Sequence, residues 1–143
     1  MIFILSGVVI APIYEEVIFR GILLKGMASK INPTVALVVS ALFFALMHMN
    51  IPQGINAFLL GLIIGAIYLN TASIYLCIFA HFVNNFVAIT ISGVFQSIDS
   101  KYAILIRGTA FIVGSSILIA AYVWYTRNKP GDVLAIHKEF IEV

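Results

Sequence analysis

Charged side chains are scarce in this sequence. Of its 143 residues only 10% are Asp, Glu, Lys or Arg, and 62% are hydrophobic. A soluble domain has about 25% charged and about 45–50% apolar residues, so the composition excludes an ordinary soluble domain and indicates an integral membrane protein. The net charge is only +2 and the basic residues are scattered. This argues against a nucleic-acid partner and leaves membrane lipid as the expected surroundings.

Cysteine is nearly absent as well. The single cysteine, Cys77, excludes a disulfide within the chain and a cysteine-rich metal site. We expect it to be a small apolar packing residue. Residues 1–6 lack the basic stretch that begins a signal peptide. We interpret them as the front of a first membrane helix, or as the start of a chain that is missing earlier helices.

Long apolar runs make up most of what remains. Several of them approach the ~20 residues that a helix needs to cross a bilayer. We therefore predict an all-α fold, a polytopic membrane bundle of about five transmembrane helices, in one domain over residues 1–126 with a short polar tail at 127–143. The predicted segments are about 2–27, 33–49, 54–70, 73–94 and 103–126.

Short polar sequences separate these segments. Asn32 followed by Pro33 is typical of an N-cap and a first helical residue, whereas the composition of residues 50–54 indicates a turn. Gly61 and Gly65 have the Gly-x-x-x-Gly spacing that lets two membrane helices approach closely. The sequence therefore predicts a tight contact between the segment at 54–70 and a neighbour.

The distribution of basic residues predicts an orientation in the cell membrane. With five crossings, five basic residues fall on the side of the C-terminus and two on the other side. The positive-inside rule then predicts a multi-pass protein with a cytoplasmic C-terminus. The two groups are Lys25, Lys30, Arg127, Lys129 and Lys138 against Lys101 and Arg107.

Three ionisable residues interrupt the first apolar segment: Glu15, Glu16 and Arg20. Ionisable side chains inside a membrane are costly and usually have a partner or a function. On a helix, Glu16 and Arg20 share a face at i, i+4, whereas Glu15 and Arg20 lie roughly 140° apart. We therefore predict that Arg20 neutralises Glu16, and that Glu15 needs another partner.

His48 and His81 are the candidate partners, because they are the two histidines within the predicted membrane segments. Depths in the membrane follow from ~1.5 Å per helical residue, counted from the side where segment one ends. Glu15 then lies roughly 18–20 Å deep and His48 roughly 22 Å. His81 lies roughly 12 Å deep and Asn85 roughly 18 Å. These depths are compatible, so three helices can converge on one polar cavity.

The chemistry of this set is hydrolytic. A carboxylate and two imidazoles can bind and deprotonate a water, either with Glu15 as the general base or through a metal held by His and Glu. Asn85, one turn after His81, can orient that imidazole or donate to an oxyanion. No covalent nucleophile is available, because no Asp lies in a predicted membrane segment to complete a Ser–His–Asp set and Cys77 has no argued base.

Three motifs resemble one known family. Residues 15–20, Glu-Glu-Val-Ile-Phe-Arg, resemble the EExxxR motif of the CAAX protease and bacteriocin-processing (CPBP, or Abi) membrane endopeptidases. Residues 44–48 look like its FxxxH motif, and residues 81–85 look like its HxxxN motif. Each motif alone is weak evidence, but the three occur in the family's order on separate segments. The resemblance covers about residues 5–93 and a final helix.

The resemblance implies a role for each matching residue. Glu15 would activate water with help from His48, and His81 with Asn85 would bind the oxyanion. Glu16 and Arg20 would be a supporting pair, and we expect Phe44 to be a wall of the cavity. The family has been described both as metalloproteases and as glutamate-dependent proteases. No cofactor is therefore certain, and any zinc would be held by Glu15, His48 and His81.

Three functions stay open on the sequence alone. The first is an intramembrane endopeptidase acting on a peptide or membrane-protein substrate, of which prenylated CAAX tails are one class known for the family. The second is a non-catalytic bacteriocin immunity or scaffolding protein built on the same bundle. The third is a small transporter or proton relay, disfavoured because no internal repeat is visible. Family members usually have further helices before the EExxxR motif, so we expect a minimal member, a short reading frame or a piece of a longer protein.

Overall fold

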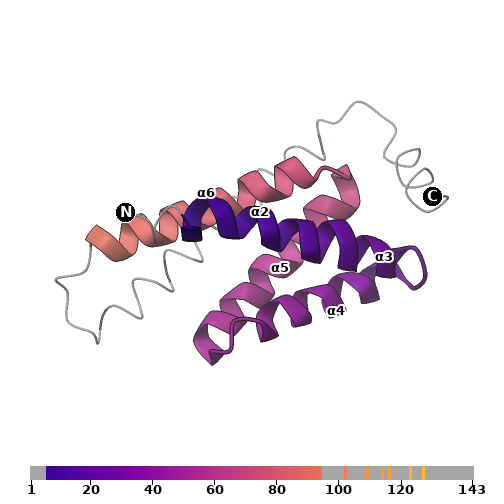
Figure 1. Ribbon diagram of the computed structural model, residues 1–143, viewed down its shortest axis with the longest axis horizontal. Coiled ribbons are helices and arrows are strands. Elements are labelled where there is room, and N and C mark those ends of the chain that lie inside the picture. The colour runs from indigo at the N-terminus through magenta and orange to yellow at the C-terminus, as the bar shows by residue number, and fades with distance from the viewer. Residues whose placement is uncertain are drawn as a thin grey trace.

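The computed structural model describes one bundle of helices joined by tight turns (Figure 1). The first helix runs without interruption through η1 (Ser6–Ile10), α2 (Ala11–Glu16), η2 (Val17–Leu24) and α3 (Lys25–Ala28). It is followed by α4 (Pro33–Leu46), α5 (Ile51–Thr71) and α6 (Ile74–Val94). The all-α prediction is confirmed for the residues that the structure describes, which are 6–94 and the isolated positions 102, 109, 114, 116, 123 and 127.

Two of these helices are long and apolar enough to cross a membrane. They are Ile51–Thr71 and residues Ile74–Ile91 of α6, whereas α4 is apolar but shorter. The first helix carries four ionisable residues between positions 15 and 25. The predicted fifth segment, 103–126, and the tail, 127–143, lie outside the described residues apart from isolated positions. The number of five crossings therefore stays a prediction.

Asparagine caps begin α4 and α5. The Asn32 side chain accepts a hydrogen bond from the Thr34 amide at 2.9 Å, which confirms the predicted cap. The Asn50 side chain accepts from the Gln53 amide at 3.2 Å. The prediction of a turn over residues 50–54 was wrong, because α5 already begins at Ile51. Proline is tolerated in a first helical turn, whose amides have no partner within the helix.

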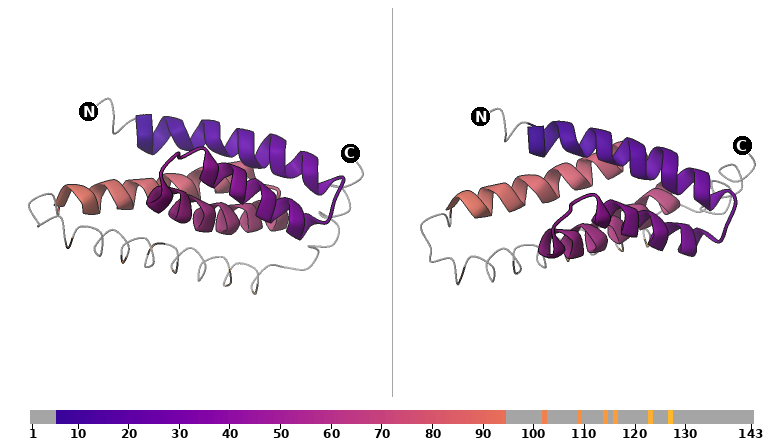
Figure 2. Two further views of the ribbon diagram at one scale, coloured as in Figure 1. Left: turned by 90° about the horizontal axis from the view of Figure 1, so that it is seen from below. Right: turned by 60° about the horizontal axis from the view of Figure 1, so that its bottom comes forward.

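The helices are arranged around one apolar core. Figures 1 and 2 show the first helix lying along α4 and α6, with α4 and α5 forming an antiparallel hairpin. The largest buried cluster joins the end of the first helix to α4, α5 and α6. A second, smaller cluster lies closer to the ionisable residues and includes Phe19, Phe44 and Ala57.

The α4–α5 hairpin is held at short range by glycine. A Cβ atom at Gly61 would lie 3.1 Å from both the Cα and the Cβ of Ala41, and one at Gly65 would collide with a methyl group of Leu37. The close helix contact predicted from the Gly-x-x-x-Gly spacing is therefore confirmed. Its effect on the site is direct, because the Gly61 carbonyl also accepts a hydrogen bond from Arg20.

Gly61→Ala should destabilise the protein. The added methyl group would press on the Ala41 backbone, which cannot move aside as a flexible side chain can. Overpacking of this kind costs about 1–3 kcal/mol, and thermal unfolding in detergent measures it. Gly26→Ala is the matched control, because a Cβ there meets nothing within 4 Å. If both variants unfold at the same temperature as the wild type, the α4–α5 contact is looser than described.

Candidate active site

The first helix carries a buried ion pair. Glu16 and Arg20 are 0% and 1% exposed, and the Arg20 Nε lies 3.0 Å from the Glu16 Oε2. The pair predicted from the i, i+4 spacing is therefore present. Because the two charges compensate each other, the helix can hold both away from water.

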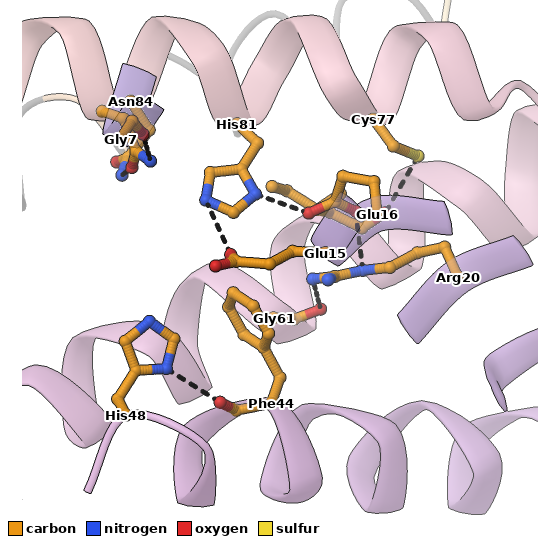
Figure 3. A network of polar contacts seen from close by, with 12 residues as sticks. Gly7, Glu15, Glu16, Arg20, Phe44, His48, Gly61, Cys77, His81 and Asn84 are labelled. Atoms are coloured by element: carbon orange, nitrogen blue, oxygen red, sulfur yellow. Dashed lines mark hydrogen bonds and ion pairs between the residues drawn. The ribbon is translucent and has the colours of Figure 1, made fainter. Parts of the chain in front are cut away.

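His81 lies between the two glutamates, as Figure 3 shows. Its Nδ1 is 2.6 Å from the Glu16 Oε1, and its Nε2 is 3.6 Å from the Glu15 Oε2. His81 is buried, and the two carboxylates differ, since the Glu15 side chain is 33% exposed whereas Glu16 is fully buried. Glu16 therefore holds the imidazole from inside, and Glu15 is the carboxylate that can reach water or a substrate.

Arg20 connects this cluster to two other helices. Its Nη2 donates to the Gly61 carbonyl of α5 at 3.4 Å, and its guanidinium carbon lies 4.8 Å from the centre of the Phe44 ring of α4. The aromatic face offers a buried guanidinium a favourable electrostatic contact. The Nη1 atom has no hydrogen-bond partner among the described residues. Arg20 is thus fixed by Glu16, Gly61 and Phe44 together.

Phe44 and His48 form the α4 side of the cluster. The prediction that segment two continues to residue 49 was wrong, because α4 ends at Leu46 and His48 lies in the following turn. Its Nδ1 donates to the Phe44 carbonyl at 2.9 Å. Since a carbonyl only accepts, the hydrogen is on Nδ1, and in the neutral ring the Nε2 lone pair is free. In Figure 3 this ring points from the end of α4 toward the level of Glu15.

The Phe44 ring packs between the two imidazoles. Its centre lies 5.0 Å from that of His48 and 5.8 Å from that of His81, with edge-to-face geometry in both contacts. Phe44 is itself almost fully buried. It therefore lies between the α4 and α6 sides of the cluster, and its role as a wall of a cavity stays a prediction.

Asn85 pairs with the first helix and not with His81 or an oxyanion site. Its Nδ2 donates to the carbonyl of Gly7 at 3.0 Å, and its Oδ1 accepts from Asn84 at 3.3 Å. Gly7 is part of η1, and in a π-helical register its carbonyl would accept from residue 12. Pro12 has no N–H to donate. The Asn85 amide thus satisfies a carbonyl that the proline leaves free, and among the described residues it makes no hydrogen bond to His81.

The same residues can be tested as a metal site. A catalytic zinc usually has three protein ligands, with nitrogen and oxygen atoms about 2.0–2.2 Å from the metal. Over residues 6–94, no group of three His, Cys, Asp or Glu side chains is arranged to hold a metal ion. As arranged here, Glu15, His48 and His81 do not form a metal site.

Two contacts could not be found from single motifs. The i, i+4 spacing predicted that Glu16 pairs with Arg20. A carboxylate has two oxygens, however, and one arginine nitrogen pairs with only one of those oxygens. The second oxygen was a sign that Glu16 needs another donor, and His81 supplies it. The link from Asn85 to Gly7 has a similar sign, since Pro12 always leaves a carbonyl without a donor.

Cys77 lies beside the cluster but has a structural contact. Its side chain is 0% exposed, and the Sγ lies 3.7 Å from the Ile64 carbonyl of α5. The thiol belongs to the main apolar cluster. This agrees with a packing residue rather than a nucleophile.

One comparison with known proteins gave a match. Residues 1–87 match the model of a protein family described as Rce1-like, type II CAAX prenyl endopeptidase Rce1-like. The matched range includes Glu15, His48, His81 and Asn85. The comparisons with curated proteins and with solved structures found no match.

Proposed function

Because this chain belongs to the Rce1-like type II CAAX prenyl endopeptidase family, whose members are intramembrane proteases, we propose that it hydrolyses a peptide bond with a water activated by Glu15. The observation that carries the proposal is the difference between the two glutamates. Glu15 is one-third exposed and faces a histidine, whereas Glu16 is fully buried and paired. Of the two glutamates, Glu15 is the one that combines access to water with a position beside His81.

Glu15 and His48 would prepare the water. The Glu15 carboxylate accepts a proton while the water oxygen attacks the carbonyl carbon of the peptide bond. The His48 Nε2 is free because Nδ1 donates to Phe44. It can accept a hydrogen bond from the second O–H of that water, which orients the water without taking its proton. When the C–N bond breaks, the proton held by Glu15 passes to the leaving amine. The reaction then needs no covalent nucleophile.

His81 and Asn85 would stabilise the oxyanion that forms on the carbonyl carbon. Glu16 accepts from the His81 Nδ1, so Nε2, which faces Glu15, is directed toward the reacting groups and donates to the oxyanion in the imidazolium form of the ring. Donors held in advance at such a position are among the largest contributions to catalysis. Asn85 can take part only if its amide exchanges the Gly7 carbonyl for the substrate. We therefore propose that the Asn85 amide donates to the Gly7 carbonyl at rest and to the oxyanion during the reaction.

A peptide or a segment of a membrane protein is the substrate class that we propose. The family description names CAAX prenyl endopeptidases, so prenylated CAAX tails are one candidate, and leader or signal peptides are others. The arrangement of Glu15, His48 and His81 supports no step through a metal ion, and none is included.

Peptide cleavage in lipid vesicles tests the proposal. The purified chain is reconstituted and incubated with a prenylated CAAX peptide and with leader peptides, and mass spectrometry identifies new termini. We expect one class to be cut at a defined bond by the wild type and not by Glu15→Gln. Cleavage at equal rates by both would refute the mechanism. A cellular phenotype that is retained in Glu15→Gln would favour the immunity or scaffolding function.

A further inference from the structure

A buried serine of α4 contacts the backbone of the first helix. Ser40 is 4% exposed, and its Oγ donates to the Phe19 carbonyl at 3.1 Å. Phe19 lies in η2, one turn after Glu15 and directly before Arg20. The bond spans 21 positions of the sequence and joins two different helices. It therefore fixes a point of the first helix next to the ionisable cluster.

This contact departs from the usual behaviour of a helical hydroxyl. A Ser or Thr within a helix commonly donates to a carbonyl of the preceding turn of its own helix. Thr71 and Thr90 follow this pattern, each donating at 2.8 Å to the carbonyl four residues earlier. Ser40 instead donates to another helix. Its bond thus depends on how the helices pack and is not a local property of serine.

The first helix is docked in the same way at a second point. The Asn85 amide of α6 donates to the Gly7 carbonyl in η1 at 3.0 Å. Both docked carbonyls, those of Gly7 and Phe19, lie in π-helical segments, and π-helical turns occur frequently at functional sites. Between these segments lies α2, which carries both glutamates. The turn with the glutamates is therefore held on either side by a side chain of a neighbouring helix.

The Ser40 contact is continuous with the His48 side of the cluster. Phe44 lies one turn after Ser40 on α4, and its ring packs edge-to-face on the Phe19 ring with 5.1 Å between the centres. The Phe44 carbonyl in turn accepts from the His48 Nδ1. Residue 19 is thus held through its backbone and its ring by two successive turns of α4, and the second of them also holds His48.

The hydrogen bond and the ring contact differ in what they can fix. Apolar packing is non-directional, so it leaves two helices free to slide or rotate by small amounts. A hydrogen bond weakens steeply when its atoms are misaligned, so the Ser40 hydroxyl favours one register. Hydrogen bonds between membrane helices contribute little to stability, whereas a displacement of about 1 Å can lower a reaction rate about 10²-fold. Loss of this hydroxyl should therefore change geometry more than stability.

From these contacts we infer that Ser40 is a positioning residue, which sets the register of the first helix against α4 and thereby places Glu15 relative to His48. Ser40 acts through the Phe19 backbone and does not itself touch the reacting groups. Its effect on catalysis rests on the proposed function, whereas its effect on the register does not.

Peptide cleavage by matched variants tests the effect on catalysis. Ser40→Ala removes the donor and should lower kcat about 10–100-fold, with KM and the unfolding temperature little changed. Ser40→Thr keeps the hydroxyl and should recover most of the lost kcat. Thr90→Val is the control, because it removes a hydroxyl bond that stays within one helix, and it should keep the wild-type kcat. If Ser40→Ala does not fold, Ser40→Cys, whose thiol is only a weak donor, replaces it.

A distance measurement separates the inference from the proposed function. Nitroxides at Ile22→Cys and Phe43→Cys, both exposed positions, report the spacing of the first helix and α4 in a Cys77→Ala chain by pulsed electron paramagnetic resonance. Ser40→Ala should shift or broaden the distance distribution, whereas Ser40→Thr and Thr90→Val should keep it.

An unchanged distribution in Ser40→Ala would overturn the inference, and so would a wild-type kcat despite a shifted distribution. If the wild type cleaves no peptide, the proposed function fails, and the distance distribution still decides whether Ser40 sets the register.

Discussion

Glu15→Gln should reduce peptide cleavage by about 10²–10⁴-fold in kcat, the usual contribution of a positioned general base. Glutamine has the same shape but cannot accept the proton of the attacking water. Because the Glu15 side chain is one-third exposed and only faces His81 at 3.6 Å, the substitution should leave the fold intact. Initial rates in lipid vesicles measure kcat, and thermal unfolding in detergent provides the check on folding.

The matched comparison uses the neighbouring acid. Glu16→Gln makes the same chemical change one residue later but on the fully buried carboxylate. If Glu15 is the base, Glu15→Gln loses activity at normal stability, whereas Glu16→Gln loses stability. The reverse pattern would assign the proton transfer to Glu16 and refute the proposed mechanism.

The Glu16–Arg20 pair is the second place where a large effect is expected. Removing one member of a buried ion pair costs about 3–5 kcal/mol, because the other charge is left uncompensated. Glu16→Gln leaves Arg20 without a carboxylate within the bundle core. Arg20→Met should cost less, because Glu16 keeps its contact with His81. Thermal unfolding of the two single variants measures this asymmetry.

Two double variants separate stability from catalysis. Glu16→Gln/Arg20→Met and Glu16→Leu/Arg20→Met both remove the two charges, so both should recover most of the lost stability. They differ in one respect, since the amide oxygen of Gln can accept from the His81 Nδ1 and Leu cannot. The Leu variant should therefore have a kcat about 10²-fold lower than the Gln variant, with KM little changed. Equal kcat values would show that Glu16 does not position His81.

Local features of the sequence predicted the main parts of the fold and the cluster. The cap at Asn32 and the pair Glu16–Arg20 depend on neighbours within four residues, so spacing alone identifies them. The Gly61 contact needs only a close neighbour helix, and the spacing of small residues indicates that. For these features the prediction agreed with the structure.

One error arose where a local pattern fits two structures, and another where the outcome depends on a different element. Residues 50–54 have the composition of a turn, but an Asn cap and a Pro in the first turn also begin α5. Asn85 could be placed one turn after His81, yet its partner is on the first helix, 78 residues away. Contacts of this kind depend on how the helices pack, which no local pattern specifies.

The separation of His81 from Glu16 along the chain has a consequence for biosynthesis. These residues are 65 positions apart. The first helix therefore leaves the ribosome long before His81, the imidazole partner of Glu16, has been synthesised. Until then Glu15, Glu16 and Arg20 must meet the translocon with only the i, i+4 pair to offset costs of about 2.5–3.5 kcal/mol for each charge. We expect a nascent chain ending near residue 50 to insert poorly, and one extended through α6 to insert well, as glycosylation-site mapping would measure. Enzyme assembly and completion of membrane insertion would then be a single event.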